Sequence, residues 1–145
     1  MINLITRYQS LNQLDIEQNT SLVLLVVRGN QQLSDQALNT TFNTSLERII
    51  ADNTGINSVD LSNNILLTDV KLYGARLTSN VLDQIVIDLD IHGLSNGILE
   101  IRDQQTGASL TSASLIAYNN LIAKGWTIDV PAPAPAPGPQ ISVVR

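Results

Sequence analysis

The 145-residue sequence contains no cysteine and one histidine, His92. The lack of cysteine excludes disulfides, a thiol nucleophile and cysteine-ligated zinc or iron–sulfur sites. With a single histidine and no cysteine, the sequence lacks the residues that most zinc sites and catalytic triads require. His92 directly precedes Gly93, so we expect it to act as a favourable cation at a helix end rather than as a catalyst.

Aromatic residues are also scarce, at 3%, although 43% of the residues are hydrophobic. The core must therefore be built from leucine, isoleucine, valine and alanine, which stack well in thin, regular layers. The length suits one domain, and we assign it to residues 1–130. This composition favours a repetitive architecture over an irregular globule.

Positively charged residues are also scarce. The sequence has eight Lys and Arg residues and thirteen Asp and Glu residues, which gives a net charge of −5. The basic residues are scattered, which argues against nucleic acid as a partner. No apolar run approaches the length of a membrane span, so we expect no membrane insertion. Residues 1–7 lack the pattern of a signal peptide. We therefore expect a protein that is made and folded inside a cell.

A pattern, L-x-x-L-x-L-x-x-N, recurs along the first half of the sequence. Its full matches are Leu11, Leu14, Ile16 and Asn19; Leu22, Leu25, Val27 and Asn30; and Ile56, Val59, Leu61 and Asn64. Repetition of this kind indicates a solenoid, in which each coil buries its apolar edge against its neighbours.

Weaker copies keep the apolar positions but replace the asparagine. They are Leu46, Ile49, Ala51 and Thr54; Leu67, Val70, Leu72 and Ala75; and Leu99, Ile101 and Gln104. The asparagines would bond backbone in the turn, so their replacement predicts an incomplete ladder of hydrogen bonds.

The middle apolar positions of the principal copies are residues 25, 49, 70, 99 and 126, separated by 24, 21, 29 and 27 residues. These spacings match the roughly 20–29-residue period of leucine-rich repeats. We expect an α/β solenoid with a parallel sheet of about five strands, the last within Trp126–Val130. The copies centred on Leu14 and Val59 lie half a coil out of phase and predict short strands on the opposite side.

Two segments between the strands change to helical periodicity. Residues 78–92 carry apolar residues with helical spacing, a capping group at Thr78, Ser79 or Asn80, and a glycine stop: Leu82, Ile85, Val86, Leu89 and Gly93. Residues 112–124 repeat the plan with a serine cap, inward apolar residues, a final lysine and a glycine stop: Ser112, Leu115, Tyr118, Ile122, Lys124 and Gly125. A shorter helix is expected at Ser34–Phe42.

A separate tail, residues 131–145, follows the solenoid. Alternate residues from Pro131 through Pro133, Pro135 and Pro137 to position 139 are proline, which favours an extended polyproline spacer. Its β-prone tip contains Ile141, Val143 and Val144. A frayed terminus is the alternative, but we expect the tail to dock against a neighbouring subunit, for example by adding a strand to a sheet edge.

Alternation along the strands assigns two outward rows. The row nearest the strand ends is Arg28, Asp52, Tyr73, Arg102 and Asp129. Its opposite charges predict a solvated ladder that supports the register by tenths of a kcal/mol per pair. Tyr73 and Arg102 are also candidates for partner contacts.

The next row is Val26, Ile50, Lys71, Glu100 and Thr127. With the neighbouring Leu24, its apolar end forms a candidate contact patch of Leu24, Val26 and Ile50. Alternatively, the N-terminal segment, with Ile2, Leu4, Ile5 and Tyr8, folds over these residues as a cap.

Carboxylates are the remaining candidates for chemistry. Asp83, Asp88 and Asp90 fall on the polar side of the helix at 78–92, where a solvated charged face explains them. Asp52 beside Asp69 or Asp129 would imitate a glycosidase pair, but nothing places two carboxylates in one pocket. The sequence shows neither a phosphate-binding glycine loop nor a calcium-loop spacing. We expect no catalytic residues, no cofactor and no metal.

The stretch Leu11–Asn64, with its Leu14-Asp15-Ile16 and Val59-Asp60-Leu61-Ser62-Asn63-Asn64 segments, resembles the short leucine-rich repeats of Bacteroidota proteins and their phages. Residues 77–130 place His92-Gly93-Leu94-Ser95-Asn96-Gly97 before a strand and end a second helix with Ala123-Lys124-Gly125-Trp126. That pattern is similar to one in phage virion proteins, often in tail or fibre components.

The resemblance implies a non-enzymatic structural protein of a phage particle: a capsid decoration, head-fibre or tail-associated subunit. Its expected partners are other virion proteins or copies of itself, and its expected location is the virion, assembled in the host cytoplasm. A bacterial surface or extracellular adhesion module that recognises protein or glycan through the sheet face is the alternative, and an intracellular partner-binding repeat protein is a third reading.

Overall fold

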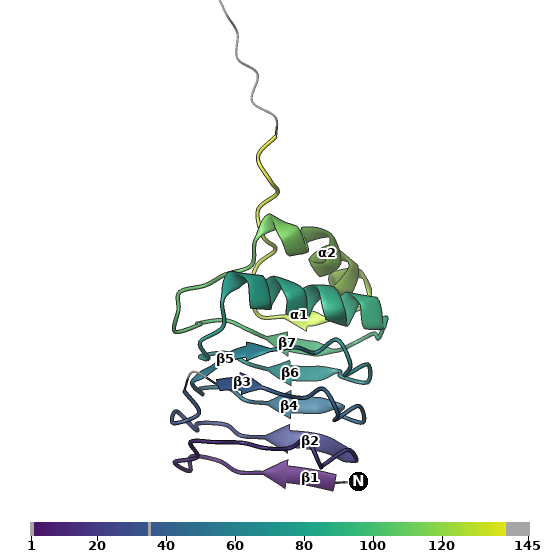
Figure 1. The fold of residues 1–145 in the computed structure, drawn as a ribbon. Coiled ribbons are helices and arrows are strands. Elements are labelled where there is room, and N and C mark those ends of the chain that lie inside the picture. The colour runs from purple at the N-terminus through teal and green to yellow at the C-terminus, as the bar shows by residue number, and fades with distance from the viewer. Residues whose placement is uncertain (1, 35, 139–145) are drawn as a thin grey trace, which may run out of the picture.

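The computed structural model of the chain describes residues 2–34 and 36–138. These residues form a solenoid-like stack with a six-stranded parallel sheet, a two-stranded parallel sheet and two α-helices (Figure 1). The strands of the larger sheet, in spatial order, are β1 (Ile2–Ile5), β2 (Leu22–Val26), β4 (Arg48–Ile50), β6 (Asp69–Lys71), β7 (Ile98–Glu100) and β8 (Thr127–Ile128). Because spatial order follows chain order, each coil stacks on the one before it.

The strand register aligns one row of apolar residues across the larger sheet. The row is Leu4, Leu25, Ile49, Val70, Leu99 and Ile128. The expected sheet of about five strands is therefore extended by β1. The predicted centre of the last strand, Trp126, is wrong by two residues. Trp126 precedes β8 and donates its indole N–H to the Leu94 carbonyl at 2.8 Å, so Ile128 takes the place in the row.

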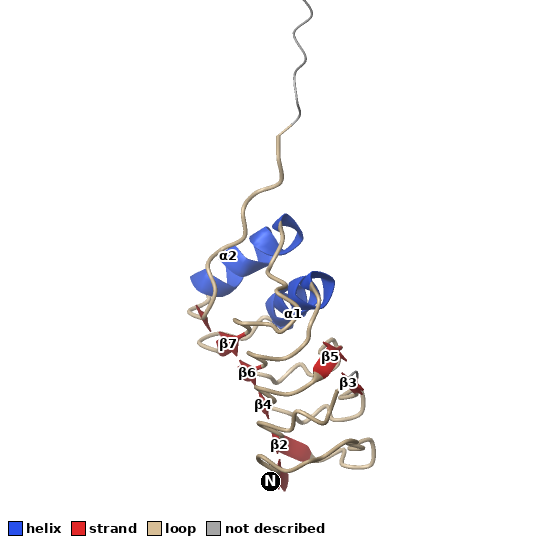
Figure 2. Cartoon of the chain, turned by 90° about the vertical axis from the view of Figure 1, so that its left-hand side faces the viewer, coloured by secondary structure: helices blue, strands red, loops and turns tan. Residues whose placement is uncertain are grey.

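On the opposite side of the coils, β3 (Gln36–Leu38) pairs with β5 (Ile56–Val59) (Figure 2). The predicted strand around Val59 is confirmed, whereas residues 6–21 contain no strand, so the one expected around Leu14 is wrong. The helix expected at Ser34–Phe42 is also wrong. Pairing of β3 with β5 satisfies the backbone of this segment, which crosses the coil in extended form.

The helix predicted at 78–92 is confirmed as α1 (Ser79–His92). The Thr78 hydroxyl accepts from the Val81 N–H, and Gly93 ends the helix at a φ of 75°. This left-handed conformation suits glycine because a Cβ would be strained there. His92 lies in the last turn, as expected.

The predicted second helix begins as a 3₁₀ turn, Ser112–Ser114, and continues as α2 (Leu115–Ala123). Its cap is Thr111 rather than Ser112. The tighter 3₁₀ turn shifts the helical phase, so Ala117, Tyr118 and Leu121 face inward. The prediction was therefore wrong for Ile122, which is exposed.

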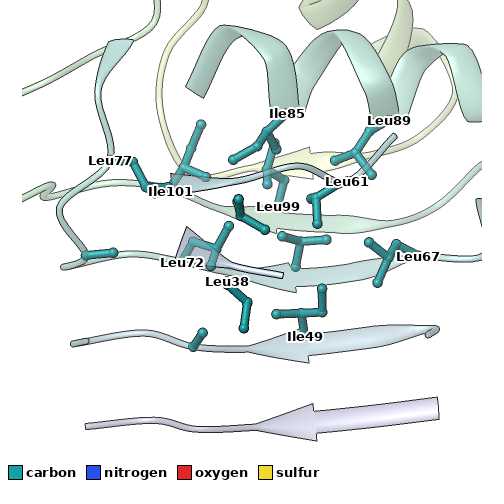
Figure 3. Close-up of a cluster of buried hydrophobic side chains, with 14 of the residues drawn as sticks. Leu38, Ile49, Leu61, Leu67, Leu72, Leu77, Ile85, Leu89, Leu99 and Ile101 are labelled. Atoms are coloured by element: carbon teal, nitrogen blue, oxygen red, sulfur yellow. The ribbon is translucent and has the colours of Figure 1, made fainter. Parts of the chain in front are cut away.

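A continuous apolar core runs between the sheet and the return side of the coils. Figure 3 shows Ile85 and Leu89 of α1 directed toward Leu61 and Leu99 of the coils below. The two helices thus cover one end of the stack, while β1 forms the other end (Figure 1). No helix within 2–34 and 36–138 is long and apolar enough to span a membrane.

A ladder of asparagine side chains connects the turns of successive coils. The Asn43 amide donates to the carbonyls of Ile16 at 2.8 Å and Asn19 at 2.9 Å. The Asn64 amide donates in the same way to the carbonyls of Thr40 and Asn43, both at 2.9 Å. Each buried amide therefore satisfies main-chain groups of the preceding coil.

Two of the residues that replace asparagine also hydrogen-bond the backbone. The Thr54 hydroxyl donates to the Ala51 carbonyl at 2.9 Å, and the Gln104 amide donates to the Leu72 carbonyl at 2.8 Å. The expected gap at Gln104 is therefore wrong, because its longer amide reaches the preceding coil. The Thr54 hydroxyl bonds only within its own coil, so the link between coils is missing there, as expected. Ala75 has no polar side chain and so makes no such bond.

Candidate binding surface

The outward row predicted at the strand ends forms a continuous chain of contacts. Arg28 Nε donates to both carboxylate oxygens of Asp52, at 3.1 and 2.8 Å, and its Nη2 donates to the Tyr73 hydroxyl at 3.3 Å. The Arg102 guanidinium lies 4.2 Å from the Tyr73 ring centroid and forms an ion pair with Asp129 at 2.9 Å. We call these five residues the charged ladder.

The charged ladder is less exposed than expected. Asp52 is fully buried, because Arg28 covers it with two hydrogen bonds and Asn53 donates a third at 3.3 Å. Tyr73 is half-buried, and Arg102 is exposed. The prediction of a solvated row is therefore wrong at Asp52.

Electrostatics favour the ordinary protonation states of Arg28, Tyr73 and Arg102. The hydrogen bond to Asp52 raises the pKa of Arg28, and burial raises the pKa of Tyr73. The hydrogen bond to Asp129 likewise raises the pKa of Arg102. A permanently charged guanidinium and a neutral phenol suit structural pairing and recognition rather than proton transfer.

The predicted apolar patch is smaller than expected. Leu24 and Ile50 are half-buried, but Val26 is only 2% exposed. The N-terminal segment does not fold over the sheet face, and that alternative is wrong. Instead β1 pairs with the edge of β2, where Ile5 lies in register with Val26, because this position satisfies the backbone of the edge strand.

The first residues of the tail pack against the solenoid. The Tyr118 hydroxyl donates to the Val130 carbonyl at 2.6 Å, and Pro133 is buried, whereas Pro131, Pro135 and Pro137 are exposed. Residues 130–134 also form one wall of a hollow of about 680 Å³. The stretch up to Pro133 is thus part of the folded body.

Beyond Pro133 the described tail runs away from the helical end of the stack (Figures 1 and 2). Residues 134–138 are exposed and contain no helix or strand. The predicted contact residues Ile141, Val143 and Val144 lie outside the described residues. An extended, exposed segment at the closed end of the solenoid is well placed to reach another molecule.

The carboxylates of α1 are not the solvated face that the sequence predicted. Asp83 is buried and accepts hydrogen bonds from the Thr111 N–H at 2.9 Å and the Ser114 hydroxyl at 2.7 Å. Asp90 binds Lys124 Nζ at 2.6 Å. The prediction was wrong at Asp83 because the start of the second helical segment packs over this side of α1.

Asp88 is also buried, contrary to expectation. It accepts from the Gln84 amide at 2.9 Å and lines a hollow of about 430 Å³ with Asp60 and Ser62. Burial raises the pKa of Asp88, although the bond from Gln84 opposes that shift. His92 Nε2 lies 3.2 Å from the Ser62 carbonyl. Within 2–34 and 36–138, no group of three or more His, Asp or Glu side chains is placed to hold a metal.

Comparisons with protein-family models, with curated proteins and with solved structures found no match.

Proposed function

We propose that this protein is a non-enzymatic subunit of a phage particle, built from leucine-rich-repeat-like coils and attached through its tail. The observation that carries the proposal is the path of the tail, which leaves the helical end extended and exposed after Pro133. The alternating prolines stiffen this segment, and polyproline advances about 3.1 Å per residue. The tail is then a spacer that separates an attachment tip from the solenoid.

The surface chemistry supports a structural role. The polar side chains of the charged ladder bind one another between coils. Asp83 similarly holds the start of the second helical segment. These groups are occupied in joining layers, which is what a rigid scaffold requires.

The deciding experiment removes residues 135–145 and leaves the packed segment that ends at Pro133. We expect the truncated chain to keep its free energy of unfolding and to be missing from purified particles. A matched control is Ile116→Ser, since Ile116 is 77% exposed on α2. This variant should be incorporated normally. Normal incorporation of the truncated chain would refute attachment through the tail.

The alternative is an adhesion module of a bacterial surface. The specific observation in its favour is the Arg102 guanidinium stacked on Tyr73, with an Arg102 side chain that is 44% exposed. Such a pair offers a charge and a ring edge to a protein or glycan. If adhesion is the function, the Tyr73→Ser, Arg102→Ser double variant should lose binding to host cells or glycans while deletion of 135–145 has no effect.

A further inference from the structure

The end of the stack formed by β1 is open. Among the described residues β1 pairs only with β2, so one side of its backbone has no strand partner. Ile2, Ile5 and Tyr8 are 48%, 54% and 71% exposed. Leu4, Leu11 and Leu14 of the same layer are half-buried and pack on the core from one side only. Strand edges of this kind are usually covered or blunted.

The asparagine ladder runs out at the same end. Asn43 and Asn64 each donate to carbonyls of the preceding coil. Asn19 occupies the equivalent place one coil earlier and receives the bond from Asn43. Its own side chain is exposed and makes no hydrogen bond to the described residues. The open end therefore presents an unused strand edge together with an unused amide.

These features define the occupant that fits. It must offer a strand edge to β1, an apolar layer to Leu4, Leu11 and Leu14, and main-chain carbonyls to Asn19. Another coil of the same kind has all three. The helices α1 and α2 cover the opposite end of the stack (Figure 1). A second copy of the protein therefore presents an uncovered coil at its own β1 end.

We propose that two copies associate face to face through this β1 layer, about a two-fold axis. The axis makes the two β1 strands antiparallel, a pairing that main-chain groups support for any side chains. It also places the corner before β2 of one copy over the corner after β1 of the other. The first corner contains Asn19 and is preceded by Asp15 and Glu17, and the second contains Arg7.

Charge is therefore complementary across the axis. Arg7 of each copy meets the acidic pair Asp15 and Glu17 of the other, and the contact occurs twice. The same arrangement brings main-chain carbonyls beyond Arg7 toward Asn19. The dimer buries the open apolar layer and leaves the two helical ends, with their tails, pointing in opposite directions. This inference does not depend on the proposed function.

The test measures the mass of the purified 145-residue chain by sedimentation velocity across micromolar concentrations. We expect a monomer–dimer equilibrium that Ile5→Lys weakens by more than about tenfold. The matched control is Ile116→Lys, an equally drastic change on the exposed face of α2, which should leave the equilibrium unchanged. A monomer at all concentrations, or equal effects of the two variants, would overturn the proposal.

Charge reversal provides a second test that does not rely on apolar contacts. Arg7→Glu should weaken the dimer severalfold, and so should the Asp15→Lys, Glu17→Lys double variant. A mixture of the two variants should form a heterodimer that is stronger than either homodimer. If the mixture shows no recovery, the two corners do not face each other. Far-UV circular dichroism of each variant verifies that the fold is intact.

Discussion

At the scale of single residues, the value of an asparagine depends on the layer that it occupies. Asn43 bridges two carbonyls of the coil below, whereas Asn19 has no coil below it among the described residues. The repeated pattern predicted Asn19, Asn30 and Asn64 but missed Asn43, because Thr40 stands where the pattern has an apolar residue. A sequence pattern identifies coil positions, but it does not show which neighbouring carbonyl each side chain reaches.

Replacement of Asn43 tests the asparagine ladder. We expect Asn43→Ala to lower the free energy of unfolding by about 1–3 kcal/mol, because two carbonyls lose a buried donor. Asn119→Ala is the matched control, since Asn119 is exposed on α2, and it should not lower stability. Urea denaturation measures both. Equal losses would mean that the ladder does not contribute to stability as described.

Close packing at a glycine provides the second residue-scale prediction. A Cβ built on Gly97 would lie 2.5 Å from the Trp126 ring, so Gly97→Ala must displace a buried tryptophan. We expect a loss of about 1–3 kcal/mol, as is typical of overpacking. Gly138→Ala is the control, since nothing lies within 4 Å of a Cβ there. Tryptophan fluorescence during urea unfolding reports on both variants. Unchanged stability of Gly97→Ala would contradict this packing.

At the scale of elements, periodicity and capping signals predicted both helices, because an apolar stripe and a glycine stop are local features. The contact between the helices was not predictable from the same signals. The periodicity of the helix predicts that Asp83 lies on the solvated face, but in the structure the second helical segment covers it. For the same reason the strand β3 was mistaken for a helix, since its structure depends on the distant β5.

The Asp83 carboxylate should therefore hold the two helical segments together. We expect Asp83→Ala to destabilise the protein by about 2–3 kcal/mol, because the Thr111 N–H and the buried Ser114 hydroxyl lose a charged acceptor. Glu47→Ala is a suitable control, because Glu47 is exposed. Hydrogen exchange of the α2 amides locates the effect, and a loss of protection confined to other regions would argue against this role.

The raised pKa of Asp88 predicts a dependence of stability on pH. The folded protein disfavours the ionised carboxylate, so stability falls as the pH rises through the folded-state pKa. We expect Asp88→Asn to raise the free energy of unfolding at pH 7 and to have little effect below about pH 3, where the carboxyl is protonated in both states. Unfolding titrations at a series of pH values test this. A variant that is less stable at pH 7 would contradict the prediction.

At the scale of the whole molecule, repeat spacing predicted a stacked parallel sheet because stacking repeats the same short-range pattern in every coil. It did not predict β1, whose residues lack the repeat pattern and join the sheet through backbone pairing with β2 and the packing of Leu4 on the core. Nor did it predict that the tail packs as far as Pro133. Composition alone does not separate a docked proline from an exposed one.

Transfer of the tail tests the proposed attachment most directly. Residues 131–145 fused to an unrelated monomeric carrier should co-purify with the phage particles and compete with the full-length chain. A fusion carrying a Gly/Ser segment of equal length is the control and should remain unbound. The account would be contradicted if the tail fusion stays unbound in particle preparations to which the full-length chain binds.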